Sequence, residues 1–363
     1  MEWNGFGNNA GAGPMARNVG QFFGIQGRVN YATWTGGGPV PPGYVSSLRW
    51  RGIEELEGWT RTLTSPQWPE ELLGAIDREA AARGEGLYRS QCIECHALVD
   101  REAHVQVDPP LDPKRPLPGL TMRTVLVARD EVGTDPGFLE NFLSRRVATG
   151  EFAGETAQGS LGDPPTLDEQ VTALVWLRHV VSNSMFGSVP ALLREVNKSK
   201  AEKRGGAADE PERYYAGDPP EDPYDVYRSR ALNGVWATPP YLHNHSVLTL
   251  ADLLLPPDQR PGEVFLGSTR YDAERAGLAN ENVCPEEWNQ PGSAWTIAEP
   301  RTWHVDPEQR AANQAADPDR TKCQAAGYHF STDTPGNLAI GHEYGTTLSD
   351  SQRADLLEFL KTL

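Results

Sequence analysis

Cysteine is scarce in this chain of 363 residues, which contains only four. Two of them lie close together, whereas Cys284 and Cys323 lie far from any other cysteine. The lack of a second close pair argues against a zinc ribbon, which takes its ligands from two such pairs. Positive charge is also scarce, since 33 Lys and Arg stand against 50 Asp and Glu and give a net charge of −17. Such a chain repels nucleic acids and acidic lipid surfaces, so we expect neither as a partner.

Long apolar runs are missing as well. No stretch approaches the ~20 apolar residues of a membrane-spanning helix, so we predict no membrane span. The first residues, Met1–Asn9, have neither the basic start nor the apolar core of a secretory signal. Glycine (36) and proline (30) are abundant by contrast, so we expect much of the chain to form loops.

One short stretch carries most of the recognisable chemistry, Cys92-Ile93-Glu94-Cys95-His96. Cys-x-x-Cys-His is typical of the attachment site of a c-type haem. Two thiols three positions apart lie on one helical turn and can each add to a haem vinyl group, and His96 then supplies a neutral imidazole to the iron. A thioredoxin-like redox pair would follow a strand, whereas a helical pattern precedes Cys92. We therefore predict one covalent haem c on Cys92, Cys95 and His96.

Helical patterns predict how the chain surrounds this site. Apolar residues recur near period 3.6 from Pro69 up to the haem cysteines. A capping box at Ser349–Gln352 begins another apolar helix, which ends the chain. Shorter helical patterns occur in 136–147, after a capping box at 166–169, and within 246–255. A cytochrome c crosses its last helix over its first, so we expect a mainly α, cytochrome c-like helical haem domain with long irregular loops.

The chain divides at about residue 66. Residues 1–66 show little helical period, so we interpret them as a loop-rich segment that covers something larger. Residues 67–363 form the predicted cytochrome domain, with an exposed linker at 198–222 and an irregular region at 256–345.

The two remaining cysteines could form a disulfide within the irregular region. In an oxidising compartment Cys284 and Cys323 would pair and stabilise the fold by ~4 kcal/mol. Two buried free thiols are the alternative interpretation.

His96 leaves the other face of the iron to be filled. Candidates are Met122, Met185, His243, His245, His304, His329 and His342. His342 lies just before the last helix in a glycine-flanked loop, Gly341–Gly345, which can approach a haem closely. Cytochromes c commonly place their distal ligand there, so we predict His342 as the second ligand. Two imidazoles saturate the iron, which suits the transfer of one electron and not the binding of oxygen.

A second dense stretch, Ala237–Ser246, reads Ala-Thr-Pro-Pro-Tyr-Leu-His-Asn-His-Ser. Its two prolines stiffen the backbone and leave carbonyl oxygens free to bind a hard cation. A rigid turn with exposed imidazoles is the alternative interpretation.

Taken together, these motifs resemble the bacterial di-haem cytochrome c peroxidase superfamily. Trp3–Gly5 is similar to the family's Trp-Asp/Asn-Gly motif, whose tryptophan relays electrons between two haems. Thr238–Asn244 is similar to its Thr-Ala-Pro-Tyr-Phe-His-Asp/Asn motif, whose Thr and Pro carbonyls help to bind calcium. The resemblance implies Trp3 as an electron relay and Thr238 and Pro240 as calcium ligands.

Departures from the peroxidase pattern bring the chain closer to the rubber oxygenase branch of that superfamily. Where the peroxidases have a distal Met, this chain has Pro257, which cannot ligate. The rubber oxygenase branch uses a late histidine in a Gly-His-Glu-Phe/Tyr-Gly stretch, and His342 matches it. In the calcium motif, His245 replaces the usual glycine.

Family members carry an earlier Cys-x-x-Cys-His that holds a catalytic haem, and no such motif precedes Trp3 here. The resemblance therefore implies that Met1 is internal to a longer protein and that this chain is its C-terminal haem portion. It would relay electrons to or from a catalytic haem in an absent N-terminal half of a peroxidase or rubber oxygenase-like oxidoreductase. The expected partner is that half or a redox protein. Alternatives are a stand-alone electron carrier and a complete peroxidase.

The predicted haem also bears on the location of the protein. A c-type haem is normally attached outside the cytoplasm, so we expect a periplasmic or secreted protein. The polar start of the chain conflicts with that expectation unless a signal peptide belongs to the missing segment.

Overall fold

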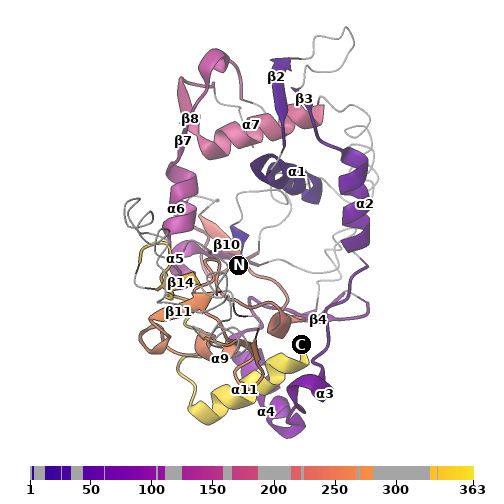
Figure 1. The fold of residues 1–363 in the computed structure, drawn as a ribbon, viewed down its shortest axis with the longest axis vertical. Coiled ribbons are helices and arrows are strands. Elements are labelled where there is room, and N and C mark those ends of the chain that lie inside the picture. The colour runs from indigo at the N-terminus through magenta and orange to yellow at the C-terminus, as the bar shows by residue number, and fades with distance from the viewer. Residues whose placement is uncertain are drawn as a thin grey trace, which may run out of the picture.

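The computed structural model describes residues 2–3, 13–25, 27–33, 44–60, 62–103, 105–110, 125–157, 166–186, 214–221, 225–266, 268, 270–280, 328–332 and 334–363. These residues form an elongated body with a group of helices at each end (Figure 1). One end holds α1 (Gly13–Ile25), α2 (Trp50–Thr60) and α7 (Ala173–Phe186). The other holds α3 (Glu70–Leu73), α4 (Arg78–Gln91), α9 (Leu250–Leu253) and α11 (Asp350–Thr362).

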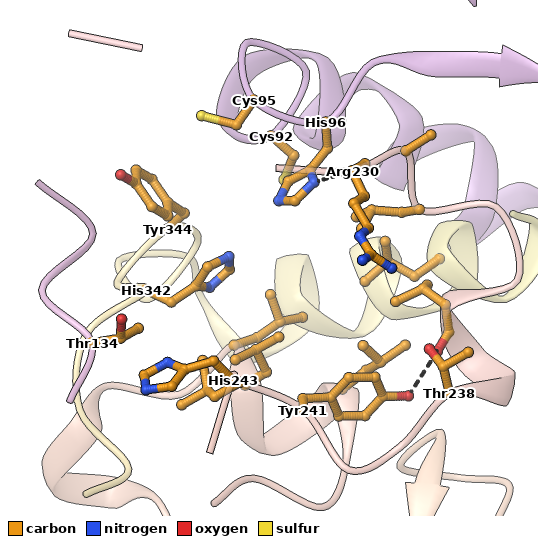
Figure 2. Close-up of a pocket in the computed structure, with 18 of the residues that line it drawn as sticks. Cys92, Cys95, His96, Thr134, Arg230, Thr238, Tyr241, His243, His342 and Tyr344 are labelled. Carbon is orange, nitrogen blue, oxygen red and sulfur yellow. Dashed lines mark hydrogen bonds between the residues drawn. The ribbon is translucent and has the colours of Figure 1, made fainter. Parts of the chain in front are cut away.

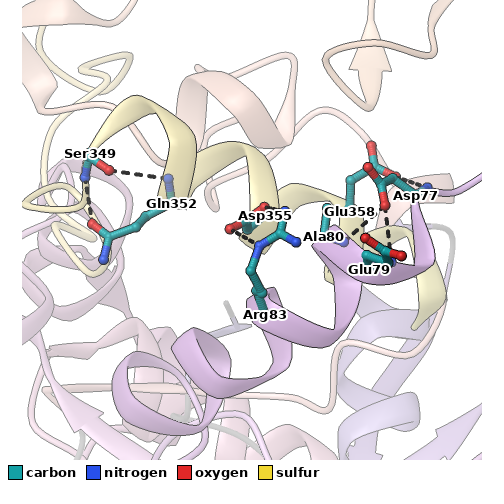
Figure 3. Close-up of polar contacts among 8 residues, drawn as sticks. All are labelled: Asp77, Glu79, Ala80, Arg83, Ser349, Gln352, Asp355 and Glu358. Atoms are coloured by element: carbon teal, nitrogen blue, oxygen red, sulfur yellow. Dashed lines mark hydrogen bonds and ion pairs between the residues drawn. The ribbon is translucent and has the colours of Figure 1, made fainter.

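Helices α4 and α11 pack against each other, so the predicted contact between the first and last helices of the cytochrome domain is confirmed. They approach most closely at Gly84, because a Cβ atom there would lie 2.0 Å from the main-chain oxygen of Asp355. Arg83 Nη2 bonds the Asp355 carboxylate at 2.7 Å across the same contact (Figure 3). The predicted capping box at Ser349 and Gln352 is also confirmed.

The helix predicted from Pro69 to the haem cysteines is wrong in one respect, because it is broken into α3 and α4. Gly74 ends α3 with φ +92°, a backbone conformation that favours glycine. Asp77 then starts α4 by accepting hydrogen bonds from the main-chain N–H groups of Glu79 and Ala80, each at 3.0 Å.

A four-stranded sheet lies in the middle of the body, and its strand order is β1-β10-β6-β9. The strands are β1 (Glu2–Trp3), β6 (Val125–Ala128), β9 (Tyr214–Ala216) and β10 (Val226–Arg228). Only β6 and β9 run parallel. The prediction of a mainly α chain is therefore incomplete, and the predicted linker at 198–222 is wrong for the residues of β9. Strands this short carry no readable alternation of polar and apolar residues.

Further strands form two-stranded antiparallel sheets among the described residues. They are β2 (Val29–Thr33) with β3 (Tyr44–Ser46), β4 (Leu98–Asp100) with β5 (Val105–Asp108), β7 (Arg146–Ala148) with β8 (Gln170–Thr172), β11 (Glu263–Leu266) with β14 (Tyr328–Ser331), and β12 (Tyr271–Asp272) with β13 (Gly277–Leu278). The remaining helices are α5 (Arg129–Val132), α6 (Gly137–Ser144) and the 3₁₀ turns η2 (Gly150–Phe152), η3 (Val235–Ala237) and η4 (Pro257–Gln259).

Two more predictions from the sequence need correction. Thr166 does not begin a helix, because it bridges Thr156 and the chain passes through β8 before α7 starts. The loop-rich interpretation of residues 1–66 is wrong for α1 and α2. In this region Val19 and Leu48 pack against Val181 of α7 in a small core of their own.

None of the described helices has the length and apolar character needed to cross a membrane. Cys284 and Cys323 lie outside the described residues, so their predicted pairing stays a prediction. The main core lies around α4, α9 and α11, where Tyr88, Leu250 and Leu356 are buried. The predicted haem attachment sequence, Cys92–His96, directly follows α4 and therefore borders this core.

At the opposite end, α7 buries a histidine against aromatic rings. His179 is 2% exposed, and its Nε2 lies 2.7 Å from the phenol oxygen of Tyr44. The ring of Trp176 stacks on it at 5.5 Å between centroids. Burial lowers the pKa of His179, so the imidazole stays neutral in the fold below the pH at which a free histidine is protonated.

This burial predicts that acid weakens the fold. As the pH falls below ~6.5, the unfolded chain protonates His179 more readily than the folded chain does, so stability falls by at most ~1.4 kcal/mol per pH unit for this proton. His179→Gln keeps hydrogen-bonding capacity and does not titrate, so it should flatten that slope. Denaturant unfolding at pH 7.0 and 5.5 measures the change in the free energy of unfolding. The same change in the wild type and in His179→Gln would show that His179 is not the group responsible.

Candidate haem site

The segment Cys92–His96 leaves α4 in a tight turn. The Cys92 N–H still bonds the Tyr88 carbonyl at 2.8 Å, and the His96 N–H bonds the Cys92 carbonyl at 2.8 Å. The Tyr88 hydroxyl, on a fully buried side chain, donates to the His96 carbonyl at 2.6 Å. These bonds bring two thiols and one imidazole to the same wall of a cavity (Figure 2).

The imidazole of His96 has a defined tautomer. Its Nδ1 lies 2.6 Å from the carbonyl oxygen of Arg230, which can only accept a hydrogen bond. Nδ1 therefore carries the proton, and Nε2 keeps a lone pair for a metal. Burial lowers the pKa of His96, which favours this neutral form.

His342 lies on the opposite wall of the cavity, with its ring facing that of His96 (Figure 2). The ring centroids are 6.3 Å apart and the planes are inclined by 49°. A metal–imidazole bond is ~2 Å long and the ring adds about 1 Å to its centroid, so two imidazoles on one metal ion have centroids ~6 Å apart. Burial also lowers the pKa of His342 to about 3. Two neutral imidazoles at this separation would be able to hold one iron ion between them.

The cavity between the histidines has a volume of about 510 Å³, within the range of sites that hold cofactor-sized molecules. Its wall is largely aliphatic, with Leu232, Val235, Leu242, Leu250, Leu253, Leu254, Leu356 and Leu360. Cys92 and Cys95 border the same space as the two imidazoles. An apolar cavity with two thiols at one edge fits the chemistry of a covalently attached porphyrin.

The thiols do not resemble those of a redox-active pair. Burial raises the pKa of Cys92 to about 12 and that of Cys95 to about 11. Thioredoxin-like cysteines have a depressed pKa, because the thiolate is the attacking species. Neutral buried thiols therefore weaken the thioredoxin-like alternative that the Cys-x-x-Cys spacing left open.

Side chains from distant parts of the chain hold the loop before His342. Asp135, 1% exposed, accepts hydrogen bonds from the N–H groups of Gly336 at 2.8 Å and Leu338 at 2.9 Å. On the other side, Asn244 Nδ2 donates to the Leu338 carbonyl at 2.9 Å, and the Ser246 hydroxyl donates to it at 3.3 Å. The stretch Ala237–Ser246 is thus neither an isolated turn nor only a source of carbonyls, because it supports this loop.

The two histidines of the stretch Ala237–Ser246 differ in their surroundings. Both line the cavity, but His243 is half-buried and stacks on Tyr227 with 5.2 Å between centroids, whereas His245 is exposed. Thr238 and Pro240 also border the cavity. The Thr238 hydroxyl donates to the Val235 carbonyl at 3.1 Å. Their predicted role as calcium ligands stays a prediction.

The structure places the main chain of Trp3 beside the site. Trp3 pairs with Tyr227 in the register of β1 and β10, and the ring of Tyr227 is the one that stacks on His243. Two candidate ligands, Met122 and His304, lie outside the described residues. A relay through Trp3 stays a prediction.

Three contributors to the site were not found in the sequence. They are the Arg230 carbonyl, the Asp135 carboxylate and the Arg260 guanidinium, which donates to carbonyls of the His342 loop. Each hydrogen bond joins a side chain to main-chain atoms of a distant segment: the His96 ring bonds the Arg230 carbonyl, and the side chains of Asp135 and Arg260 bond the main chain before and at Gly341. No spacing or motif in the sequence indicates such contacts. The burial of Asp135 and Arg260 is a property of the fold and is not visible in the sequence.

Comparison with known families bears on the centre of this site. Residues 226–265 match the family described as RoxA-like, cytochrome c-like. The matched segment runs from β10 to β11 and includes Arg230, the Ala237–Ser246 stretch and Arg260. The match supports a rubber oxygenase-like cytochrome c portion that carries haem c and functions in electron transfer.

The chain is also similar to proteins of Sinorhizobium fredii. It is 24% identical to the uncharacterized protein y4iJ over 371 residues, which cover 96% of this chain and 51% of y4iJ. It is 45% identical to the uncharacterized protein y4iM over 51 residues, which cover 14% of this chain and 12% of y4iM. The chain therefore spans about half the length of y4iJ and a smaller part of y4iM.

Proposed function

We propose that this chain is the electron-transfer portion of a di-haem oxidoreductase related to the bacterial peroxidases and rubber oxygenases. Cys92 and Cys95 would hold one haem c covalently, and His96 and His342 would ligate its iron. A haem with two imidazole ligands supplies a one-electron couple without an open coordination position. The observation that carries the proposal is the opposition of the two imidazoles, 6.3 Å apart, across an apolar cavity beside the two thiols.

The chain's own residues prepare such a site for electron transfer. The Arg230 carbonyl orients His96, and aliphatic side chains form much of the wall around the position that the metal would take. A rigid ligand set changes little between two oxidation states, which favours rapid exchange of one electron. Trp3 would couple the haem to a second, catalytic haem, because β1 pairs with the strand whose Tyr227 stacks on cavity-lining His243.

Exposed apolar side chains in the first 66 residues support a large partner for that part of the molecule. Ile25, Val45, Leu56, Trp59 and Leu63 are between 52% and 78% exposed, and they all belong to the first 66 residues. Large apolar side chains gathered in one region mark interaction surfaces. We propose that residues 1–66 face a catalytic haem domain and that residues 67–363 form the cytochrome domain, in a periplasmic or secreted protein.

Covalent haem attachment is the direct test of the cofactor. Co-expression with a cytochrome c maturation system should give one haem per chain that stays with the protein after acid–acetone extraction. Replacing both Cys92 and Cys95 by serine should abolish this retained haem, because no thioether can form. The matched control replaces Cys284 and Cys323 by serine and should keep it. A colourless wild-type protein, or a coloured double-serine variant, would reject the site.

The gene sequence immediately upstream of Met1 distinguishes the two leading functions. A second Cys-x-x-Cys-His and a signal peptide in frame support a relay to a catalytic haem. Their absence favours a stand-alone electron carrier. A complete peroxidase would instead react with peroxide as the isolated chain, which two tightly bound imidazoles should prevent.

A further inference from the structure

Arg260 is a buried cation next to the loop that carries His342. The residue is 6% exposed. Its Nη1 donates to the carbonyls of Ala339 at 2.9 Å and Gly341 at 2.8 Å, and its Nη2 donates to the His342 carbonyl at 3.3 Å. One guanidinium thus contacts three carbonyls within four residues of the loop.

The same guanidinium also holds the end of α9. Its Nε donates to the Leu255 carbonyl at 3.0 Å, and Nη2 donates to the Leu253 carbonyl at 3.2 Å. Leu253 borders the cavity. Arg260 therefore ties the segment Ala339–His342 to the part of the cavity wall that α9 forms.

This arrangement is unusual for an arginine. Among the described residues, no carboxylate forms an ion pair with Arg260, and main-chain carbonyls are its recorded acceptors. Burial lowers its pKa to about 10, so it is still protonated at neutral pH. A buried cation without a direct counter-charge is costly to keep. The planar fork of five N–H donors matches several carbonyls at once, as no other side chain can.

His342 itself is held through its main chain. Its N–H bonds the Val132 carbonyl at 2.7 Å, and its backbone is left-handed with φ +51°. The preceding Gly341 packs so closely that a Cβ atom would lie 2.2 Å from the main chain of Gly133. In contrast, Nδ1 of the His342 ring has no hydrogen-bond partner among the described residues. The loop backbone therefore decides where the imidazole lies.

We propose that Arg260 is a positioning residue that keeps the His342 imidazole opposed to His96, so that its loss frees His342 from the haem iron. The inference rests on the proposed bis-histidine haem. The loop 336–342 is then held at both of its ends. Asp135 bonds Gly336 and Leu338 at the first end, and Arg260 bonds the carbonyl of His342 at the second.

Cyanide binding to the ferric holoprotein tests this role, because cyanide must first displace His342. Arg260→Gln removes the charge and most of the donors. It should raise the apparent cyanide affinity about tenfold or more, since that affinity scales with the fraction of chains whose iron is open. A high-spin signal should appear in the low-temperature EPR spectrum, and added imidazole should remove it. Arg260→Lys keeps the charge but cannot reach every carbonyl, so its cyanide affinity should rise less than that of Arg260→Gln.

Arg353 provides a matched control. It lies on α11, and its Nη1 also donates to carbonyls after His342, those of Thr346 and Leu348. Arg353→Gln should lower the unfolding temperature and leave cyanide affinity at the wild-type value. A purely structural Arg260 would behave in the same way.

The outcomes separate this inference from the proposed ligation. If a variant lacking the His342 imidazole becomes high-spin but both Arg260 variants bind cyanide as the wild type does, only the role of Arg260 is wrong. If loss of the imidazole leaves the haem low-spin, His342 is not the ligand and both proposals fail. Should Arg260→Gln not accumulate as folded protein, Arg260→Lys decides the question, and an unchanged cyanide affinity overturns the inference.

Discussion

Replacing His342 by glycine is expected to convert a low-spin haem protein into a high-spin one with an open coordination position. Glycine tolerates the backbone of His342 at φ +51° without strain, so the loop can keep its course while the imidazole is lost. Cyanide affinity should rise by about a hundredfold or more, as expected when the open form goes from ~1% to nearly all molecules. Absorption and EPR spectra, with and without added imidazole, measure the change.

His245→Gly is the control for this experiment. His245 has a similar left-handed backbone, φ +62°, but its side chain is exposed. His245 also borders the cavity, but its side chain is exposed and its Nδ1 lies 3.5 Å from the Pro240 carbonyl oxygen, so its loss should leave spin state and cyanide affinity unchanged. A His342→Gly protein with the wild-type spectrum would show that another residue completes the coordination of the iron.

Gly84→Ala should be among the most destabilising single-methyl additions in this fold. The added Cβ would lie 2.0 Å from the Asp355 oxygen, 2.6 Å from its carbonyl carbon and 2.9 Å from Phe359 Cβ. Main-chain atoms cannot rotate away, so α4 and α11 would have to separate. Overpacking commonly costs ~1–3 kcal/mol, and we expect the upper end or more here. Denaturant unfolding of the holoprotein measures the change.

Gly86 offers a control in the same helix. No heavy atom lies within 4 Å of a Cβ built there. Gly86→Ala should stabilise the protein by about 0.5–1 kcal/mol, because alanine has the higher helix propensity. If both substitutions changed stability in the same direction and by similar amounts, close packing at Gly84 would not control the helix contact.

Local patterns predicted several of the fold's elements. The capping box at Ser349 and the final helix were predictable because their hydrogen bonds and apolar period involve residues within a few positions of one another. The break before α4 also has local causes, Gly74 and the cap at Asp77, but the continuous apolar pattern concealed it. The four-stranded sheet was not predictable, because it pairs short segments as far apart in sequence as β1 and β10.

The candidate site divides in the same way. The turn at Cys92–His96 is local, and its motif predicted which side chains meet at the cavity wall. The facing position of His342 was predicted from its glycine-flanked loop before the last helix and from the resemblance, because no local pattern connects it with Cys92–His96. The Arg230 carbonyl accepts a hydrogen bond from His96, and the Arg260 side chain donates to main-chain carbonyls. Main-chain carbonyls occur at every residue, so neither bond produces a recognisable sequence pattern. Sequence reasoning thus finds candidate ligands more readily than the groups that orient them.

The packing of α11 on α4 has a consequence for how the molecule is assembled. Helix α4, which leads to Cys92 and Cys95, cannot pack against α11 until the ribosome has released residues Asp350–Thr362. During synthesis, Cys92 and Cys95 are therefore not yet enclosed by Leu356 and Leu360 of the cavity wall. A porphyrin attached as we propose would therefore reach both thiols before α11 completes the cavity wall.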